Sequence, residues 1–224
     1  MRIKSIAFAA VLFVAATAPA CAGTGFYVGL GAGWDNQSNV DLNGLHPPFT
    51  NGQVSNHDGV IFAGTLGFKL PMFPLRIEFE SSYDWHSASS VNLGGTTYSA
   101  TGHDNIAGEL FNAIYDLPVG PGWNLYAGGG VGPGHVHFVP TLSGTGEQLA
   151  DVDHWAFMWQ LIGGASFEIA PDADVFVDYR YRDARARGTL STSFGVLDAG
   201  PTTENVVMAG VRFYMFPFPP GVEP

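Results

Sequence analysis

Charged side chains of both signs recur at every second position in several segments of the chain. In residues 75–86 the charged residues alternate with apolar and aromatic ones, and residues 175–182 repeat the pattern. Guanidinium and carboxylate groups can pair through two parallel hydrogen bonds, and they must pair wherever water is excluded. If these polar faces meet in one interior, they predict an ion-pair cluster. Its members would be Arg76, Glu78, Glu80, Asp84, Glu109, Asp178, Arg180, Arg182 and Arg212. We interpret the cluster as an internal plug, with a lining for ion conduction as the alternative.

Seven histidines form the second group of residues with chemical potential. In His135-x-His137, both rings would lie on one face of a strand, at a spacing that a metal ion can use. The alternative is that these rings lie in wet segments that tolerate histidine. His135 and His137 are therefore the candidate metal ligands of the sequence.

Signals for catalysis or cofactor binding are weak. A hydrolase needs a nucleophile beside a base, and the nearest pairing is His86-Ser87, whose side chains would point to opposite faces of a strand. The glycine runs 29–33 and 128–134 lack the helix that a nucleotide-binding loop requires. We expect neither catalytic residues nor a bound cofactor.

The elements that would position these residues are long β-strands. Alternation of apolar and polar residues with a period of two indicates a strand with two different faces. Seven of the eight segments also reach the about 9–11 residues that a transmembrane strand needs. Eight segments show the pattern, at residues 26–35, 60–70, 75–86, 105–116, 123–131, 155–169, 175–182 and 207–215.

One of these strands does not have a single consistent pattern. Its first part places Ile106 and Leu110 on the apolar face and Glu109 on the polar face, whereas its second part places Phe111 and Tyr115 on the apolar face. A β-bulge between the two parts would reconcile them.

The connections alternate between short turns and long polar loops. The turns lie at 69–74, 117–122 and 170–172, and the loops at 36–57, 87–102, 139–153 and 188–203. Together with apolar outer faces, this alternation predicts an all-β fold, namely an eight-stranded antiparallel transmembrane up-and-down β-barrel with a polar interior. Aromatic residues near strand ends would form its interfacial girdles. They are Trp34, Trp85, Trp123, Trp155 and Tyr214.

The two ends of the chain have their own character. Residues 1–22 resemble a cleaved signal peptide, with Arg2 and Lys4 before a short apolar stretch and with small residues before a cut after Ala22 or Ala20. Its loss would reduce nine basic residues to seven, against 20 acidic residues, and would change the formal charge from −11 to −13. Nucleic acid is a poor partner for such a chain. The barrel would occupy residues 23–216, and residues 217–224 would be a Pro-rich periplasmic tail.

The last two strands resemble the closing hairpin of the small outer-membrane barrel superfamily of OmpA transmembrane-domain, OmpX and opacity-type proteins. The runs that carry this resemblance are 175–182 and 206–216, and it extends by pattern over most of the chain. Gly210, Phe213 and Phe216 also resemble the C-terminal signal that the outer-membrane assembly machinery recognises. The resemblance implies a place in the bacterial outer membrane, in contact with its lipid and lipopolysaccharide.

Two classes of function follow as expectations. The first is a structural and surface-interaction protein, not an open porin, that displays four long extracellular loops to an extracellular partner. The second is a narrow channel for ions or small solutes, although eight strands leave a lumen that side chains can fill. A lipid-A modifying enzyme is a third and less favoured interpretation, since some barrels of this size have that activity.

Overall fold

The computed structural model describes residues 25–43, 52–71, 73–93, 95–143, 152–185, 189–192, 195–199 and 201–216. The expected signal peptide at 1–22 and the expected tail at 217–224 lie outside these ranges. Within them, no helix is long and apolar enough to cross a membrane.

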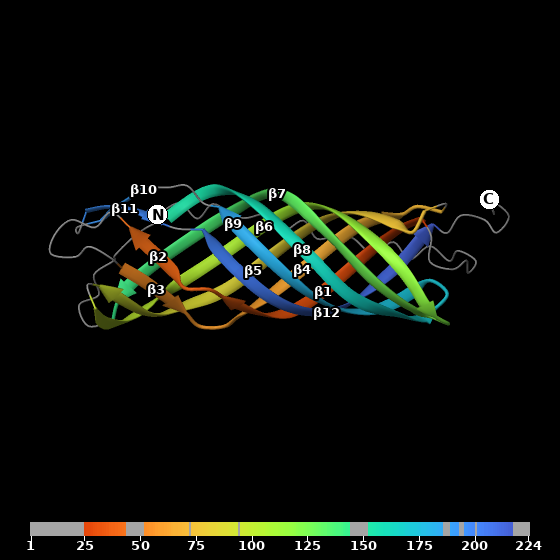
Figure 1. Cartoon of the computed structure of the whole chain (residues 1–224), viewed down its shortest axis with the longest axis horizontal. Coiled ribbons are helices and arrows are strands. Elements are labelled where there is room, and N and C mark those ends of the chain that lie inside the picture. The colour runs from red at the N-terminus through yellow and green to blue at the C-terminus, as the bar shows by residue number, and fades with distance from the viewer. Residues whose placement is uncertain are drawn as a thin grey trace.

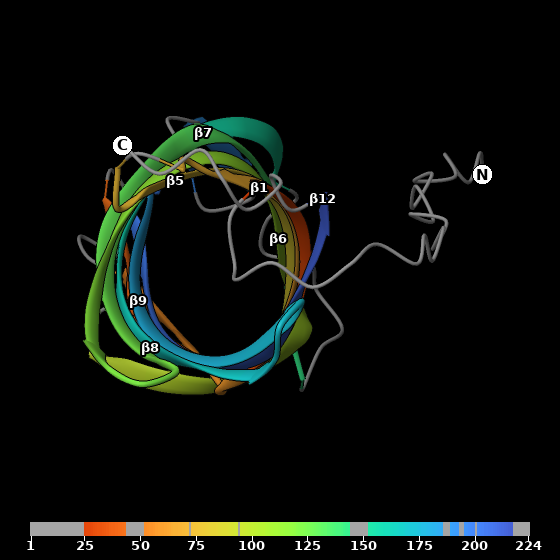
Figure 2. The ribbon, with the colours of Figure 1, turned by 90° about the vertical axis from the view of Figure 1, so that its right-hand side faces the viewer.

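Long antiparallel strands form the wall of the molecule. Each strand pairs with its neighbours along the chain, and β1 also pairs with β12, which closes the ring of eight strands in the described residues. Figure 2 shows this closed ring in end view. The predicted antiparallel β-barrel is therefore confirmed. Its strands are β1 (Gly25–Gln37), β4 (Gly59–Lys69), β5 (Leu75–Leu93), β6 (Thr96–Gly120), β7 (Trp123–Leu142), β8 (Val152–Ala170), β9 (Ala173–Arg185) and β12 (Thr202–Phe216).

Four shorter strands extend the sheet at the end that carries the long connections, which we call the loop end (Figure 1). In the described part of the chain, their order is β10, β11, β2 and β3, and β3 pairs with the far part of β5. The sequence did not predict them, because segments of four or five residues between polar loops carry little periodicity. They are β2 (Val40–Asn43), β3 (Gly52–Asn56), β10 (Thr189–Thr192) and β11 (Gly195–Ala199).

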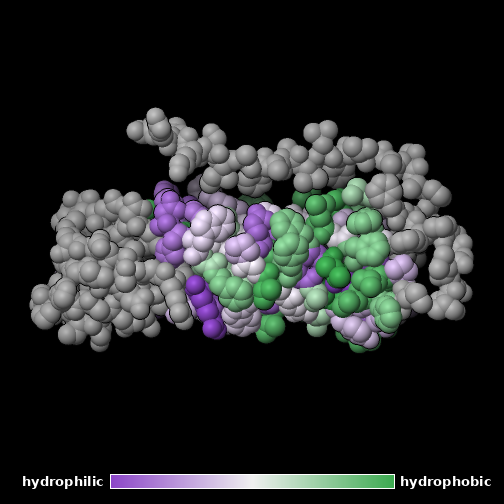
Figure 3. Space-filling model, turned by 90° about the horizontal axis from the view of Figure 1, so that it is seen from above, coloured by the Kyte–Doolittle hydropathy of each residue, from purple (hydrophilic) through white to green (hydrophobic). Residues whose placement is uncertain are grey.

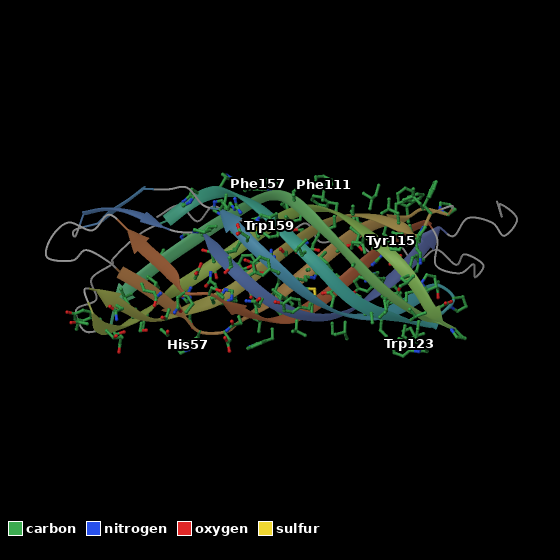
Figure 4. The ribbon with its side chains drawn as sticks, in the orientation of Figure 1. His57, Phe111, Tyr115, Trp123, Phe157 and Trp159 are labelled. Atoms are coloured by element: carbon green, nitrogen blue, oxygen red, sulfur yellow. The ribbon has the colours of Figure 1, made fainter. Side chains whose placement is uncertain are left out.

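The alternation of the sequence becomes an alternation between outside and lumen. On β9, the even-numbered residues from Asp174 to Arg182 are buried in the lumen, while Val175, Val177 and Tyr179 face outward. Phe111, Phe157 and Trp123 project from the outer wall (Figure 4). On the face drawn in Figure 3, apolar side chains gather toward the short-turn end and hydrophilic ones toward the loop end.

Strand β6 differs from the sequence expectation. Ile106, Leu110 and Asn112 all face the lumen, and Glu109 faces outward, where it accepts a hydrogen bond of 2.8 Å from Ser81 Oγ. The predicted bulge is absent from this described strand, because its pairing with β7 keeps one register from Gly108 to Phe111. The placement of Glu109 in the interior was wrong. Ile106 and Leu110 instead join an apolar cluster that fills the lumen, together with Val136, Ala156, Met158 and Ala184.

The expected aromatic girdles are corrected at one position. Trp34, Trp85, Trp123 and Trp155 lie on the outer surface as expected, each at least half exposed. Tyr214, in contrast, is buried in the lumen, because it alternates with the outward-facing Phe213 on β12.

Candidate functional site

The lumen near the short turns holds a network of paired charges, which we call the lower network. Arg76 on β5 lies 3.0 Å from Glu78 and 3.0 Å from Asp116 on β6. Tyr27 on β1 donates a hydrogen bond to Glu78. The ring of Tyr27 occupies space that a side chain at position 67 would take, because a Cβ on Gly67 would lie 2.1 Å from Tyr27 Cζ. The full set is Tyr27, Lys69, Arg76, Glu78, Glu80, Asp116, Asp174, Asp178, Arg180, Arg212 and Tyr214.

Arg212 and Tyr214 bring β12 into the lower network. Asp174 on β9 accepts hydrogen bonds of 2.9 Å from Arg212 Nη1 and 2.9 Å from the Tyr214 hydroxyl. The Arg212 guanidinium also lies 4.3 Å from the centre of the Phe176 ring and 5.1 Å from that of Tyr126. These contacts hold the cation between a carboxylate and two aromatic faces, which favours its burial.

Arg180 crosses the lumen to the opposite wall. Its Nη1 lies 2.7 Å from Glu80 Oε2 on β5, and its Nε lies 2.8 Å from Asp178 on its own strand. In the ring order, β5 and β9 are four places apart among eight described barrel strands, so this pair spans the full width of the barrel. Glu80 also accepts hydrogen bonds from Asn112 and Gln160, at 3.1 and 3.3 Å.

Arg182 repeats this crossing one step nearer the loop end. Its Nη1 lies 2.6 Å from Asp84 Oδ2 on β5 and 3.2 Å from Glu204 Oε2 on β12, and its Nη2 donates to Ser82 Oγ at 2.8 Å. One guanidinium therefore serves two carboxylates at this level.

Acidic groups dominate the lumen at the level of Arg182 and from there toward the loop end. We call Asp35, Asp84, His86, Asp104, Arg182 and Glu204 the upper acidic cluster, and all six are buried. His86 Nε2 lies 3.1 Å from Asp35 Oδ2. Four carboxyl groups thus face one guanidinium and one imidazole.

Several atoms of the upper acidic cluster lack a partner among the described residues. Neither Asp35 Oδ1 nor Glu204 Oε1 has a hydrogen bond or an ion pair there, and His86 Nδ1 has no hydrogen-bond partner. Asp35, His86 and Glu204 each offer a ligand atom, and these atoms lie within 4.8 Å of one another. The arrangement can hold a cation.

A layer of amide side chains adjoins the cluster toward the loop end. Asn56 on β3 donates a hydrogen bond of 2.8 Å to Asp104 Oδ2 and a second one to Gln37, the next inward residue after Asp35 on β1. The short strand β3 therefore contributes directly to the lining of the lumen.

The residues singled out in the sequence divide into two groups. Glu109 lies on the outer wall, as described above, whereas all the other members of the expected ion-pair cluster are buried in the lumen. Sequence reasoning did not include Asp35, His86, Asp104, Asp116, Asp174 or Glu204 in that cluster. The same alternation could have added Asp35 and His86, because each follows an outward-facing tryptophan.

His135 and His137 lie on the outer face of β7, away from the lumen. His135 Nε2 lies 2.7 Å from Asp153 Oδ1, and its ring packs edge-on against Trp155, with 5.1 Å between the centroids. Among the described residues, the groups of three or more candidate metal ligands do not include either histidine. Their role as metal ligands stays a prediction.

Comparisons with known proteins agree with this architecture. Residues 6–213 match the family model described as outer membrane protein beta-barrel domain. The Neisserial surface protein A structure is similar, with a TM-score of 0.54 and 17% identity over 86% of this chain and 98% of that one. The outer membrane protein OprG from Pseudomonas aeruginosa gives a TM-score of 0.52 and 14% identity over 86% and 97%. The protease OmpT from Escherichia coli gives a TM-score of 0.51 and 8% identity over 84% of this chain and 96% of that one. No curated protein sequence matches the chain. At these identities, the likeness to solved structures shows the fold alone.

Proposed function

The chain belongs to the outer membrane protein beta-barrel domain family and lies in the bacterial outer membrane, and from this premise we propose that it is a closed surface-interaction barrel rather than an open porin. Its wall anchors the protein in lipid, and its long connections meet partners outside the cell.

The main support for a closed lumen comes from two ion pairs that cross it from β9 to β5. Arg180 reaches Glu80 and Arg182 reaches Asp84, with both arginines at most 3% exposed. Apolar side chains, including Ile61, Ile114 and Met208, form a further buried cluster. An open path would require these buried pairs to separate, and a buried charge without its partner is strongly unfavourable.

The length of the strands supports display outside the membrane. A transmembrane strand needs about 9–11 residues, whereas β5 has 19, β6 has 25 and β7 has 20. In barrels of this class, short turns face the periplasm and long loops face the outside. The extra length of β5, β6 and β7, with the four short strands, therefore forms an extracellular platform.

The partners follow from the surfaces. The outward apolar side chains suit membrane lipid and the acyl chains of lipopolysaccharide, and the C-terminal strand suits recognition by the assembly machinery. An extracellular partner binds the platform and the loops. The acidic character of the chain disfavours nucleic acid.

We propose no catalytic role. His86 is buried in the lumen, whereas Ser87 is exposed, so the adjacent histidine and serine considered from the sequence face opposite sides of the wall. This pair therefore does not support the lipid-A modifying activity considered from the sequence.

Conductance measurements test the closed lumen. Purified full-length protein in planar bilayers is expected to give no steady single-channel current, and an open porin incorporated in the same way serves as the control for sensitivity. A steady current from the wild-type protein would overturn the closed barrel and put the narrow channel first. Binding of whole cells to variants that lack residues 44–51 or 144–151 tests display: unchanged binding by all loop variants would contradict it.

A further inference from the structure

We propose that Asp35, His86 and Glu204 bind a divalent transition-metal ion inside the lumen, at the loop end of the barrel. The site lies inside the lumen, but the proposal does not depend on the lumen being closed, and it would hold whether or not the barrel conducts.

The geometry of the three side chains suits one ion. They come from β1, β5 and β12, and their ligand atoms lie within 4.8 Å of one another. Bonds from a metal ion to carboxylate oxygen or imidazole nitrogen are about 2.0–2.2 Å long, so ligands on opposite sides of an ion are separated by roughly 4.2 Å. The 3.1 Å between His86 Nε2 and Asp35 Oδ2 matches the spacing of adjacent ligands.

The wall is shaped to let these groups meet. Strand β4 lies between β1 and β5, and its residue opposite Asp35 is Gly59. A Cβ at Gly59 would lie 2.4 Å from His86 Cδ2. The missing side chain therefore leaves the gap through which the His86 ring reaches toward Asp35 across β4.

The unpartnered atoms point to a ligand. Asp35, His86 and Glu204 are each at most 1% exposed, yet Asp35 Oδ1, Glu204 Oε1 and His86 Nδ1 lack hydrogen bonds within the described structure. Buried polar atoms without partners are costly. A bound cation would satisfy the carboxylate oxygens and one imidazole nitrogen together.

The charge balance points to a cation. Arg182 is the guanidinium of the upper acidic cluster, and its closest contact is Asp84 at 2.6 Å. Within the cluster, three more carboxyl groups have only His86 and the second contact of Arg182 to offset their negative charge. They belong to Asp35, Asp104 and Glu204. The lower network, in contrast, sets Arg76, Arg180 and Arg212 against its carboxylates. A dication would offset the excess negative charge where it accumulates.

The donor set selects the kind of ion. Carboxylates alone would suit Ca²⁺ or Mg²⁺, whereas an imidazole ligand favours Zn²⁺, Cu²⁺, Fe²⁺ and related ions. Two carboxylates and one imidazole, with water in the other positions, are therefore expected to prefer Zn²⁺ or Cu²⁺ to Ca²⁺. Asp35 and His86 each follow an outward-facing tryptophan, Trp34 and Trp85 respectively.

Titration calorimetry on the full-length protein in detergent tests the site. Metal-free wild-type protein is expected to bind one Zn²⁺ per chain at micromolar or tighter affinity and Ca²⁺ far more weakly. Asp35→Asn and Glu204→Gln, which keep side-chain volume, are expected to weaken Zn²⁺ binding about tenfold or more. His135→Ala/His137→Ala is the matched control, and its affinity for the lumen site is expected to stay unchanged. Affinity lost only in that control variant, or equal binding of Ca²⁺ and Zn²⁺, would overturn the proposal.

Two further measurements do not depend on changing a ligand. Electron paramagnetic resonance of Cu²⁺ bound to the wild-type protein is expected to show coupling to one imidazole nitrogen. Gly59→Ala is expected to weaken Zn²⁺ binding by displacing His86, while a folded barrel is verified by its resistance to SDS before boiling. A spectrum without nitrogen coupling would overturn the assignment to His86, and so would unchanged affinity in Gly59→Ala.

Discussion

Arg182 on β9 and Asp84 on β5 lie 2.6 Å apart across the full width of the barrel, and both side chains are completely buried. The two strands are four places apart in the closed ring, so their only route to each other is through the lumen. This pair fixes the distance between opposite walls and places a positive charge among carboxylates that have few other partners.

Loss of the Arg182 guanidinium is expected to destabilise the barrel strongly. Arg182→Ala leaves Asp84 and Glu204 buried without their cation, and it is expected to lower the free energy of unfolding by about 3–5 kcal/mol. Arg185→Ala is the control, because Arg185 is on the same strand and pairs with Asp183 but is 63% exposed. Its loss is expected to cost about 0–1 kcal/mol. Urea unfolding of lipid-reconstituted protein measures both, and equal effects would contradict a dry lumen.

Two glutamates distinguish the inner from the outer wall of the barrel. Glu80→Gln removes the charge that Arg180 contacts at 2.7 Å inside the lumen, and it is expected to lower the unfolding free energy by several kcal/mol. Glu109→Gln changes a group on the outer wall that binds Ser81, and surface changes of this kind are usually within about 0.5 kcal/mol. A larger loss in Glu109→Gln, measured by the same unfolding titration, would contradict the register of β6.

A charge on the outer wall is expected to oppose membrane insertion. Val177→Arg places a guanidinium on the apolar outer face of β9, where Val177 is 55% exposed, and it is expected to cost about 2–4 kcal/mol near the middle of the bilayer. Thr101→Arg, in the extended part of β6, is the control and should be nearly neutral. The efficiency of folding into liposomes measures the difference between the two variants. Equal folding of both would contradict contact between the outer face and lipid.

The closed ring predicts resistance to detergent. Because every barrel strand among the described residues is paired on both sides, SDS has no free sheet edge at which to begin unfolding. Unboiled protein is expected to migrate differently from boiled protein on an SDS gel and to fractionate with the outer membrane. Identical migration before and after boiling, or recovery in the soluble periplasm, would contradict the fold.

The sequence by itself was sufficient for the barrel and for most of its inner face. Alternation with a period of two assigns Glu80, Arg180 and Arg182 to one face, because successive side chains in a strand point to opposite sides. It failed in β6, where Ile106 and Leu110 were expected outside because they are apolar. A narrow lumen must be filled as well as charged, so apolar residues also belong inside, and polarity alone does not identify the face.

Only the tertiary structure decided which side chains meet. The contact of Arg182 with Asp84 depends on the number of strands and on the stagger with which the sheet closes, and neither quantity is encoded in the pattern of any one strand. Asp35, His86 and Glu204 come from three strands, and they meet because Gly59 leaves a gap in a fourth. Local alternation fixes the direction of a side chain, whereas its height and its neighbours in the lumen are set by the pairing register around the whole ring.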